Sequence, residues 1–380
     1  MPTKPLTIIQ VLPALNGGGV EKGTLEIGHY LAQQGHRSIV VSAGGRMVEQ
    51  LIAEGSEHIR ADIGAKKLST LRYIFWFRKL LKEIRPDIIH FRSRLPAWIG
   101  YLAWRSLPER VRPRLVTTFH GQHSVNRYSA IMARGERVIT LSNFMREYIL
   151  KSYPDVDSNK ITVIHRGVDT GLYNPSYQPD NDWSKRWFQE FPQTQNIALL
   201  TLPGRLTRRK GIEDFIRIIG NLRQADIAIH GLIVGEAHPK QRHYQHELEQ
   251  LISTEGLEDD ITFTGHRTDL QNILVLSTAV LSLSKEPEAF GRTTIEALSM
   301  GVPVIGYAHG GVEEQLTMLF PEGKVAAGNI DQATEVLIRF FSTSFPKVKD
   351  NRLFTLHSMC EKTLAVYQEL TQSKPLSANH

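Results

Sequence analysis

The sequence has little of the chemistry that covalent cross-links or membrane spans require. Cys360 is the single cysteine among 380 residues, which excludes an internal disulfide framework and is typical of a reducing compartment. No apolar run is long enough to cross a bilayer, and residues 1–15 lack the layout of a signal peptide. We therefore expect a cytoplasmic protein in which Cys360 fills a buried position in a helix.

Metal-ligating patterns are also scarce. His238, His243 and His246 lie near one another but have no cysteine or carboxylate at ligand spacing, so we interpret them as surface residues. Asp155 and Asp157 form an Asp-x-Asp pattern of the kind that binds metals, but they follow a proline in a loop, away from the end of any predicted strand. The sequence therefore predicts no metal site.

The chain is too long for one ordinary domain, and its charge is unevenly distributed. Its 380 residues, 41% apolar and 22% charged, predict two globular domains. Residues 1–175 contain 25 Lys and Arg against 14 Asp and Glu, whereas residues 176–380 contain 20 against 25. Residues 60–114 alone contain 14 cationic and 4 acidic side chains. This excess predicts an anionic partner: a membrane surface, a nucleic acid or a phosphorylated substrate.

The chain begins as a doubly wound sheet. Residues 6–12 form a predicted strand, Gly17, Gly18 and Gly19 follow it, and a helix then leads into a second strand at residues 38–42. The dinucleotide fingerprint Gly-x-Gly-x-x-Gly is absent. Three successive glycines exceed what a tight turn requires, which favours close approach of the backbone to a ligand over a simple turn.

Two later strands end in polar residues. The predicted strand at 87–91 is followed by Arg92 and Arg94, which either meet an anionic acceptor group or lie in a solvated loop. The predicted strand at 115–119 is followed by His120. A lone histidine is more often structural, but the carboxyl end of a parallel strand is where doubly wound sheets bind ligands.

The second half contains cations and carboxylates at similar places. Gly204, Arg205 and Lys210 follow a predicted strand, and two cations can stabilise the negative charge of a phosphate group. Glu288 and Glu296 are eight residues apart, before and inside a predicted helix at 292–300 whose N-terminus is an anion site. For the glutamate pair alone, a capped surface helix with incidental carboxylates would be the simpler interpretation.

The segment 284–315 closely resembles the signature of retaining glycosyltransferases of the GT-B fold, family 4. The resemblance rests on Pro-Glu-Ala-Phe-Gly before the helix, and on Gly-Val-Pro-Val-Ile and Gly-Gly after it. It extends over the whole chain and is most specific in residues 204–311. It implies two facing doubly wound Rossmann-like α/β domains, an acceptor-binding domain at residues 1–175 and a donor-binding domain at residues 176–360. A C-terminal helix at 361–380 would cross back to the first domain.

The resemblance also implies the roles of individual residues. His120, Arg205, Lys210 and Glu288 would be catalytic, and Glu296 would bind the ribose. The donor-binding residues would be Gly18, Gly19, Gly204, Arg205, Lys210, Gly235, Arg267, Phe290, Gly291, Arg292, Thr293 and Glu296. Arg92 and Arg94 would contact the acceptor. The substrate would be a nucleotide-diphospho-sugar, with no cofactor and no metal, because cationic side chains replace the metal.

The implied function is transfer of a hexose-type sugar to a cell-envelope glycan or lipid-linked acceptor, with retention of anomeric configuration. Three alternatives use the same features. A GT-B sugar-nucleotide epimerase would share fold and donor, and a non-catalytic nucleotide-sugar sensor could lose Glu288 and His120. A nucleic-acid binder would explain the basic segment but not the glutamates, so we expect no nucleic-acid partner.

The basic segment has two interpretations of its own. Residues 66–82 combine cations with Tyr73, Phe75, Trp76 and Phe77 at helical spacings. This pattern predicts either a core-packing helix with a solvated basic face or a helix at an anionic membrane surface. The second interpretation would make the protein peripheral at the inner face of the cytoplasmic membrane.

Overall fold

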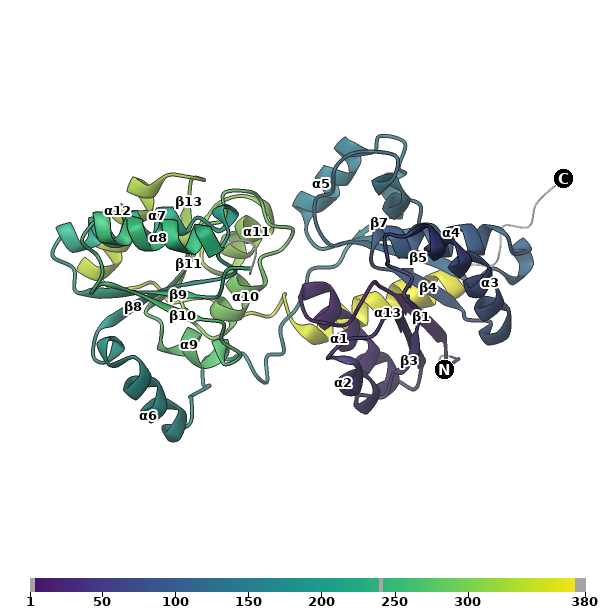
Figure 1. Ribbon diagram of the computed structural model, residues 1–380, viewed down its shortest axis with the longest axis horizontal. Helices are drawn as coiled ribbons and strands as arrows, with labels where there is room; N and C mark the ends of the chain where they lie inside the picture. Colours follow the sequence, from purple (N-terminus) through teal and green to yellow (C-terminus); the bar gives the residue numbers. More distant parts are fainter. Residues whose placement is uncertain (1–3, 239–241, 373–380) are drawn as a thin grey trace. The chain divides into compact units, whose positions relative to one another are not determined.

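The computed structural model describes residues 4–238 and 242–372, which divide into two compact units (Figure 1). Unit 1 contains the chain up to Arg166 and again from Leu356, and unit 2 is Gly167–Thr355. Both crossings lie before the expected boundaries after residues 175 and 360. The two crossings lie close together in space, because the chain leaving unit 1 pairs with the chain returning to it. The Val168 amide donates to the Phe354 carbonyl at 3.0 Å, and both residues belong to unit 2.

Unit 1 is built on a seven-stranded parallel sheet in the order β3-β2-β1-β4-β5-β6-β7. Its strands are β1 (Thr7–Val11), β2 (Arg37–Ser42), β3 (Glu57–Arg60), β4 (Ile88–Phe91), β5 (Arg114–Phe119), β6 (Arg137–Thr140) and β7 (Ile161–Val163). The inner strands are almost entirely buried, as expected for a parallel sheet with helices on both faces.

The helices of unit 1 cover both faces of this sheet. They are α1 (Gly19–Gln33), α2 (Val48–Ala53), α3 (Arg72–Ile84), α4 (Arg94–Arg105), α5 (Asn143–Ser152) and α13 (Leu356–Gln372). The C-terminal helix α13, yellow in Figure 1, packs on the sheet through Met359, Cys360 and Tyr367, in one core cluster with Ile8 and Ile88. The last helix returns to unit 1 and Cys360 is buried, as expected, but the helix begins at Leu356 instead of residue 361, and the expected part at 373–380 lies outside the described residues.

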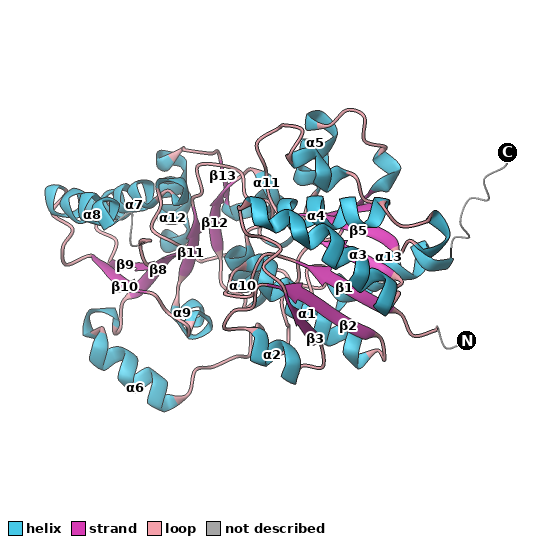
Figure 2. Cartoon of the chain, turned by 45° about the vertical axis from the view of Figure 1, so that its right-hand side comes forward, coloured by secondary structure: helices cyan, strands magenta, loops and turns pink. Residues whose placement is uncertain are grey.

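Unit 2 repeats the architecture with a six-stranded parallel sheet in the order β10-β9-β8-β11-β12-β13. Its strands are β8 (Ala198–Pro203), β9 (Ile229–Val234), β10 (Ile261–Gly265), β11 (Ala279–Ser282), β12 (Val304–Tyr307) and β13 (Lys324–Val325). Its helices are α6 (Asn181–Glu190), α7 (Ile212–Gln224), α8 (Arg242–Thr254), α9 (Leu270–Leu276), α10 (Arg292–Ser299), α11 (Gly310–Leu319) and α12 (Ile330–Ser342). Figure 2 shows the strands of each unit in magenta among cyan helices.

Each sheet has a switch point, where the order of its strands reverses. In unit 1 it lies between β1 and β4, and in unit 2 between β8 and β11. The loops that follow these strands part to opposite faces of the sheet, which leaves room for a ligand at their carboxyl ends. None of the helices in residues 4–238 and 242–372 combines the length and the apolar character that a membrane span needs.

Candidate active site

The loops at the switch point of unit 2 carry the predicted cations and the first predicted glutamate. The loop after β8 contains Gly204, Arg205 and Lys210, and the loop after β11 contains Glu288. Arg205 is exposed, whereas Lys210 and Glu288 are partly covered. Strands β8 and β11 are parallel neighbours, so both loops leave the same edge of the sheet. The fold therefore brings together residues that are about 80 positions apart in the sequence.

The Glu288 carboxylate is bound by groups from both loops. Nζ of Lys210 lies 2.6 Å from Oε1 of Glu288, the Ser284 hydroxyl donates to the same oxygen at 2.5 Å, and Nη2 of Arg209 is 4.0 Å away. Burial raises the pKa of Glu288, but the charge of Lys210 and the hydrogen bonds from Lys210 and Ser284 outweigh it, so the pKa lies below its ordinary value. Glu288 is ionised at neutral pH and can accept hydrogen bonds from hydroxyl groups.

Two glycines allow the loops after β8 and β9 to touch. Gly235 has a φ of 150°, and a Cβ at this position would lie 2.0 Å from the carbonyl oxygen of Gly204. Gly204 has a φ of 151°, and its own Cβ would lie 3.1 Å from Cε of Lys210. Side chains at either position would separate the loops or displace Lys210. Gly204 therefore leaves room for the lysine, and Gly235 leaves room for the backbone of Gly204.

Helix α10 supplies the second predicted glutamate. It begins directly after Gly291, whose φ of 85° suits glycine and which makes no side-chain cap hydrogen bond. The first N–H groups of a helix have no partner within the helix itself, so the start of α10 carries the partial positive charge that favours an anion. One turn later, Oε1 of Glu296 accepts a hydrogen bond from Nε of Arg292 at 3.0 Å. Glu296 is 5% exposed, so its carboxylate is buried beside the Arg292 guanidinium.

The glycine pair after β12 holds the glutamate loop in place. A Cβ on Gly311 would lie 2.4 Å from Cα of Phe290, and one on Gly310 would lie 2.5 Å from the Glu288 carbonyl oxygen. The Gly311 amide donates to that carbonyl at 2.8 Å. The Phe290 side chain is buried, with its ring centroid 5.8 Å from that of Phe354. Any contact of Phe290 with a ligand would therefore come from its backbone.

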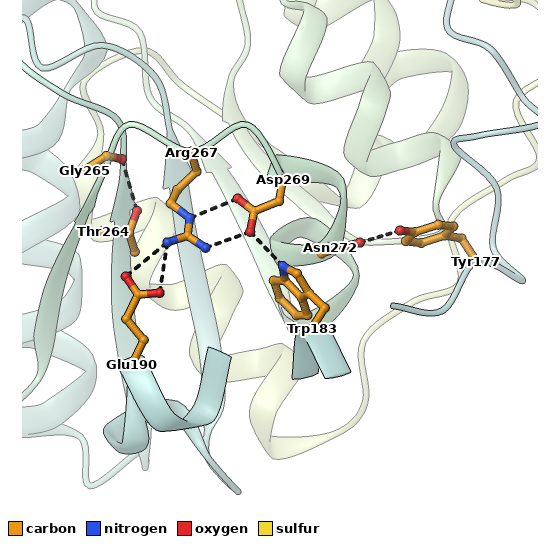
Figure 3. Close-up of polar contacts among 8 residues, drawn as sticks. All are labelled: Tyr177, Trp183, Glu190, Thr264, Gly265, Arg267, Asp269 and Asn272. Atoms are coloured by element: carbon orange, nitrogen blue, oxygen red, sulfur yellow. Dashed lines mark hydrogen bonds and ion pairs between the residues drawn. The ribbon is translucent and has the colours of Figure 1, made fainter. Parts of the chain in front are cut away.

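Arg267, a predicted donor-binding residue, is held by contacts within unit 2. Its guanidinium makes paired hydrogen bonds to Asp269, at 2.9 and 2.7 Å, and to Glu190, at 3.1 and 3.2 Å (Figure 3). It also lies over the rings of Trp187 and Phe191. These contacts tie the loop after β10 to helix α6, and Trp183 of α6 donates to the same Asp269 at 2.7 Å. The Arg267 guanidinium therefore links two segments of unit 2, a role that the sequence around it did not indicate.

In unit 1, the two predicted acceptor-binding arginines lie in different environments. Arg92 is 3% exposed and donates to the Gln10 side chain at 2.9 Å, so it does not present its charge to an acceptor as expected. Side chains alternate along a strand, so Arg92 follows His90 onto the face that α1 and α13 cover. Arg94 is partly exposed at the start of α4, donates to the Ser129 hydroxyl at 3.0 Å and lies over the Tyr128 ring.

His120 lies at the end of β5, as predicted, and its partner was not anticipated. Nη2 of Arg166 donates to Nδ1 of His120 at 3.2 Å. Burial, followed by the charges of Arg166 and Arg92, lowers the pKa of His120 well below its ordinary value. The predicted glycines of the first loop also lie at the edge of unit 1: Gly18 caps α1, and Gly19 is its first residue. No local pattern links Arg166 to His120, because 45 residues separate them in the chain.

These features define a class of protein. Two doubly wound parallel α/β units, one of which joins Lys210 to Glu288 at its switch point, are the arrangement of GT-B glycosyltransferases. Residues 17–172 match the family model described as Glycosyltransferase Family 4, and residues 181–351 match that of Glycosyl transferases group 1. The chain belongs to the family 4 glycosyltransferases of the GT-B fold.

Individual relatives agree with this assignment. The N-acetyl-alpha-D-glucosaminyl L-malate synthase of Bacillus anthracis is 24% identical over 351 residues, which cover 87% of this chain and 86% of the relative. A glycosyltransferase of Rickettsia africae superposes with a TM-score of 0.85 at 28% identity, over 98% of this chain and 100% of its own. Anabaena HepE in complex with UDP and glucose supports the fold, with a TM-score of 0.71 at 18% identity and 97% coverage of each chain.

A relative from envelope biosynthesis matches over a shorter length. The lipopolysaccharide core biosynthesis mannosyltransferase LpsB of Rhizobium meliloti is 26% identical over 212 residues, 55% of this chain and 56% of the relative. The relatives therefore act on different sugars and acceptors. The family is established, and the substrates of this chain have to be argued from its own site.

Proposed function

We propose that the protein transfers a hexose-type sugar from a nucleotide-diphospho-sugar to a cell-envelope glycan or lipid-linked acceptor, with retention of anomeric configuration. The observation that carries this proposal is the joining of Lys210 and Glu288 at 2.6 Å at the switch point of unit 2. A cation beside an ionised carboxylate suits a ligand with a phosphate next to a polyhydroxylated sugar. Glu296 lies in the adjacent helix, where a ribose diol can be bound.

In this proposal, Lys210 and the exposed Arg205 bind the diphosphate together with the first amides of α10. Glu288 orients the sugar through its hydroxyl groups, and Glu296 binds the ribose. Gly18, Gly19 and His120 of unit 1 contact the sugar or the acceptor, and Arg94 remains the candidate for an anionic acceptor group. Arg92 and Arg267 are left out of the contact set because their guanidinium groups are engaged within the protein.

The reaction breaks the bond between the anomeric carbon and the phosphate oxygen and forms a bond from that carbon to an acceptor oxygen on the same face. The acceptor proton passes to the departing phosphate oxygen. Negative charge grows on the diphosphate as the bond breaks, so fixed cations stabilise the transition state more than the ground state. Lys210 and Arg205 supply this stabilisation, and we propose that no metal is required.

A thermal-shift screen against UDP-, GDP- and ADP-sugars tests the donor class. A ligand at 100 times its dissociation constant adds about 2.7 kcal/mol to the free energy of unfolding, so the correct nucleotide should stand out. The NMR coupling constant at the anomeric proton of the transferred sugar then reports retention. Conversion of the donor alone into an epimer would favour the epimerase alternative, and stabilisation without transfer to envelope extracts would favour a sensor.

We propose a second property, peripheral binding to the anionic inner face of the cytoplasmic membrane. The start of α3 and the turn before it expose apolar side chains among cations: Leu68 is 89% exposed, Phe75 is 76% and Leu71 is 53%. Lys66, Lys67 and Arg72 lie in the same stretch, and Phe77 faces the core. Exposed apolar groups beside cations suit an interface where lipid tails meet anionic headgroups.

Liposome co-sedimentation tests this second proposal. The wild type should bind anionic vesicles at low salt, and Phe75→Ser with Lys66→Gln and Lys67→Gln should bind less while nucleotide affinity stays unchanged. Salt screens attraction between exposed charges, so release at high salt is expected. Generic duplex DNA is the matched competitor: if DNA binds and anionic vesicles do not, the basic surface serves nucleic acid instead.

A further inference from the structure

The guanidinium of Arg166 lies where three elements of unit 1 meet. Its Nη2 donates to Nδ1 of His120 after β5, at 3.2 Å, and its Nη1 lies 3.8 Å from the sulfur of Met359 in α13. It also rests against helix α1, since a Cβ built on Gly23 would lie 1.7 Å from Nη1. Arg166 is 6% exposed. The side chain is therefore enclosed by packing, and its contact with His120 has little freedom to shift.

The chemistry of arginine decides which way this hydrogen bond runs. A guanidinium has five N–H donors, no acceptor and a permanent charge. Nδ1 of His120 must therefore accept, and the neutral imidazole must carry its proton on Nε2. The imidazole stays neutral because burial, and then the charges of Arg166 and Arg92, lower its pKa well below the ordinary value. Nε2 of His120 is buried and has no hydrogen-bond partner within the described part of the chain.

We propose that Arg166 is a positioning residue, which fixes His120 as a neutral Nε2–H donor for a hydroxyl oxygen of a ligand bound to unit 1. The proposal rests on the proposed glycosyl transfer for the identity of the ligand, whereas the protonation state of His120 stands by itself. A charged imidazolium would favour anionic ligands and titrate in the working pH range. A fixed neutral donor recognises a hydroxyl oxygen instead.

Gly23 leaves the space that the Arg166 guanidinium occupies. It lies inside helix α1, where alanine is ordinarily the better helix former. Here an alanine side chain would occupy the position of the Arg166 guanidinium. Gly23→Ala should therefore displace the guanidinium from His120 while leaving its charge in the protein. Gly220→Ala in α7 is the matched control, since its Cβ would meet Leu257 at an ordinary 3.5 Å.

The direct test is a long-range ¹H–¹⁵N correlation spectrum of the full chain with ¹⁵N-labelled histidine. The His120 signals are assigned by their loss in His120→Asn. In the wild type at pH 6 to 8, Nδ1 should be unprotonated and Nε2 protonated. Arg166→Met and Gly23→Ala should shift the ring towards the other tautomer or towards the imidazolium. Arg137→Gln, which removes the 2.6 Å contact of β6 with Glu369 in α13, should leave the His120 signals unchanged.

Kinetics separate positioning from folding. Arg166→Met should lower kcat about tenfold or more, change the KM for the donor less, and make activity fall as pH drops through the ordinary histidine pKa of about 6.5. Arg166→Lys, which keeps a charged donor, should recover part of kcat.

A proton on Nδ1 in the wild type would overturn the proposal, since no variant has to fold for that measurement. An Arg166→Met protein with an unchanged His120 spectrum and pH profile would also overturn it. If the spectrum is as expected and no donor is ever turned over, the proposed glycosyl transfer fails and the assignment of His120 stands.

Discussion

The two units share one fold but differ in the charged groups at their sites. Unit 1 buries the cations Arg92 and Arg166 beside His90 and His120, whose pKa values are lowered well below the ordinary one. Unit 2 pairs each of its site carboxylates with a cation, as in Glu288 with Lys210 and Glu296 with Arg292. The site of unit 1 therefore contains neutral imidazoles beside buried guanidinium groups. The site of unit 2 contains ion pairs, whose cations can also bind an anionic ligand.

Under the proposed function, this contrast matches different ligands to the two units. The phosphate groups of a donor suit unit 2, because Lys210 can exchange part of its contact with Glu288 for a phosphate oxygen without leaving the carboxylate unsatisfied, as Ser284 still donates to it. The hydroxyl-rich groups suit the neutral histidine of unit 1. Substitutions that remove one member of each arrangement test this division.

The largest effect is expected from Lys210→Ala. The lysine charge matters most as the diphosphate departs, so kcat should fall by about 100-fold or more, while the affinity for the intact donor changes less. Steady-state kinetics with the identified donor measure this. Arg208→Ala is the control, because Arg208 lies in the same turn and pairs with Glu247 instead. A variant in which KM rises and kcat is unchanged would make Lys210 a binding residue only.

Glu296→Ala should weaken the binding of the nucleoside diphosphate. The ribose hydroxyls would lose a charged acceptor worth about 1.5–3 kcal/mol, which corresponds to an affinity loss of roughly 10- to 150-fold. Isothermal titration calorimetry with the free nucleoside diphosphate measures it directly. Glu313→Ala in the first turn of α11 is the matched control, since Glu313 is partly exposed and pairs with Lys324. Equal affinity of Glu296→Ala and wild type would exclude ribose binding by Glu296.

Arg267→Leu should lower the stability of the protein and leave its affinity for the nucleotide unchanged. The substitution removes the hydrogen bonds to Asp269 and Glu190. We expect the free energy of unfolding to fall by about 1–3 kcal/mol, which lowers the thermal midpoint. Affinity for the nucleoside diphosphate should stay within about twofold. Arg186→Leu, an exposed arginine of α6, should leave both quantities unchanged. A large drop in nucleotide affinity with an unchanged thermal midpoint would restore Arg267 to the donor-binding residues.

The smallest effect is a difference in acid sensitivity. Unit 1 contains histidines whose pKa is lowered chiefly by burial: His36, His58, His90, His120 and His123, the last to about 4. The unfolded chain binds more protons below the ordinary histidine pKa of about 6.5. Their stabilising contribution is therefore complete above this pH and is lost progressively as the pH falls below it.

In unit 2, burial likewise lowers the pKa of His230, whereas the carboxylates titrate in a lower window. The pKa values of Glu288 and Asp269 are lowered although burial raises them, so their contribution is present above their unfolded values of about 4.5 and 3.8 and is lost only as the pH falls below these. At about pH 5.5, hydrogen exchange should therefore rise first in unit 1, after correction for the intrinsic rate. Earlier loss of protection in unit 2 would contradict this contrast between the units.

Much of the fold could be predicted because local patterns determine it. Apolar runs bounded by glycines indicated the strands, and the segment around Glu288 and Glu296 indicated the helix and strand that follow. The close approach at Gly311 also followed a recognisable Gly-Gly pattern. These features depend on neighbours in the chain, which a sequence displays directly.

The remainder depends on contacts between distant segments. Arg92 lies on the covered face of its sheet because α13, more than 260 residues later, packs there. Arg267 binds the nearby Asp269 but also Glu190 of α6, 77 positions earlier, and Gly23 matters because Arg166 packs against it. A charged residue at a strand tip looks the same in the sequence whether it meets solvent, a ligand or the interior.

The central claim is that unit 2 holds the nucleotide of the donor at its switch point. Hydrogen–deuterium exchange of the full chain with UDP, GDP or ADP tests it without knowledge of the acceptor. The account predicts that one nucleotide protects the peptides containing residues 203–211 and 284–300 of unit 2 more than any peptide around residues 16–19 of unit 1. Protection confined to unit 1, or none with any nucleotide at saturating concentration, would contradict it.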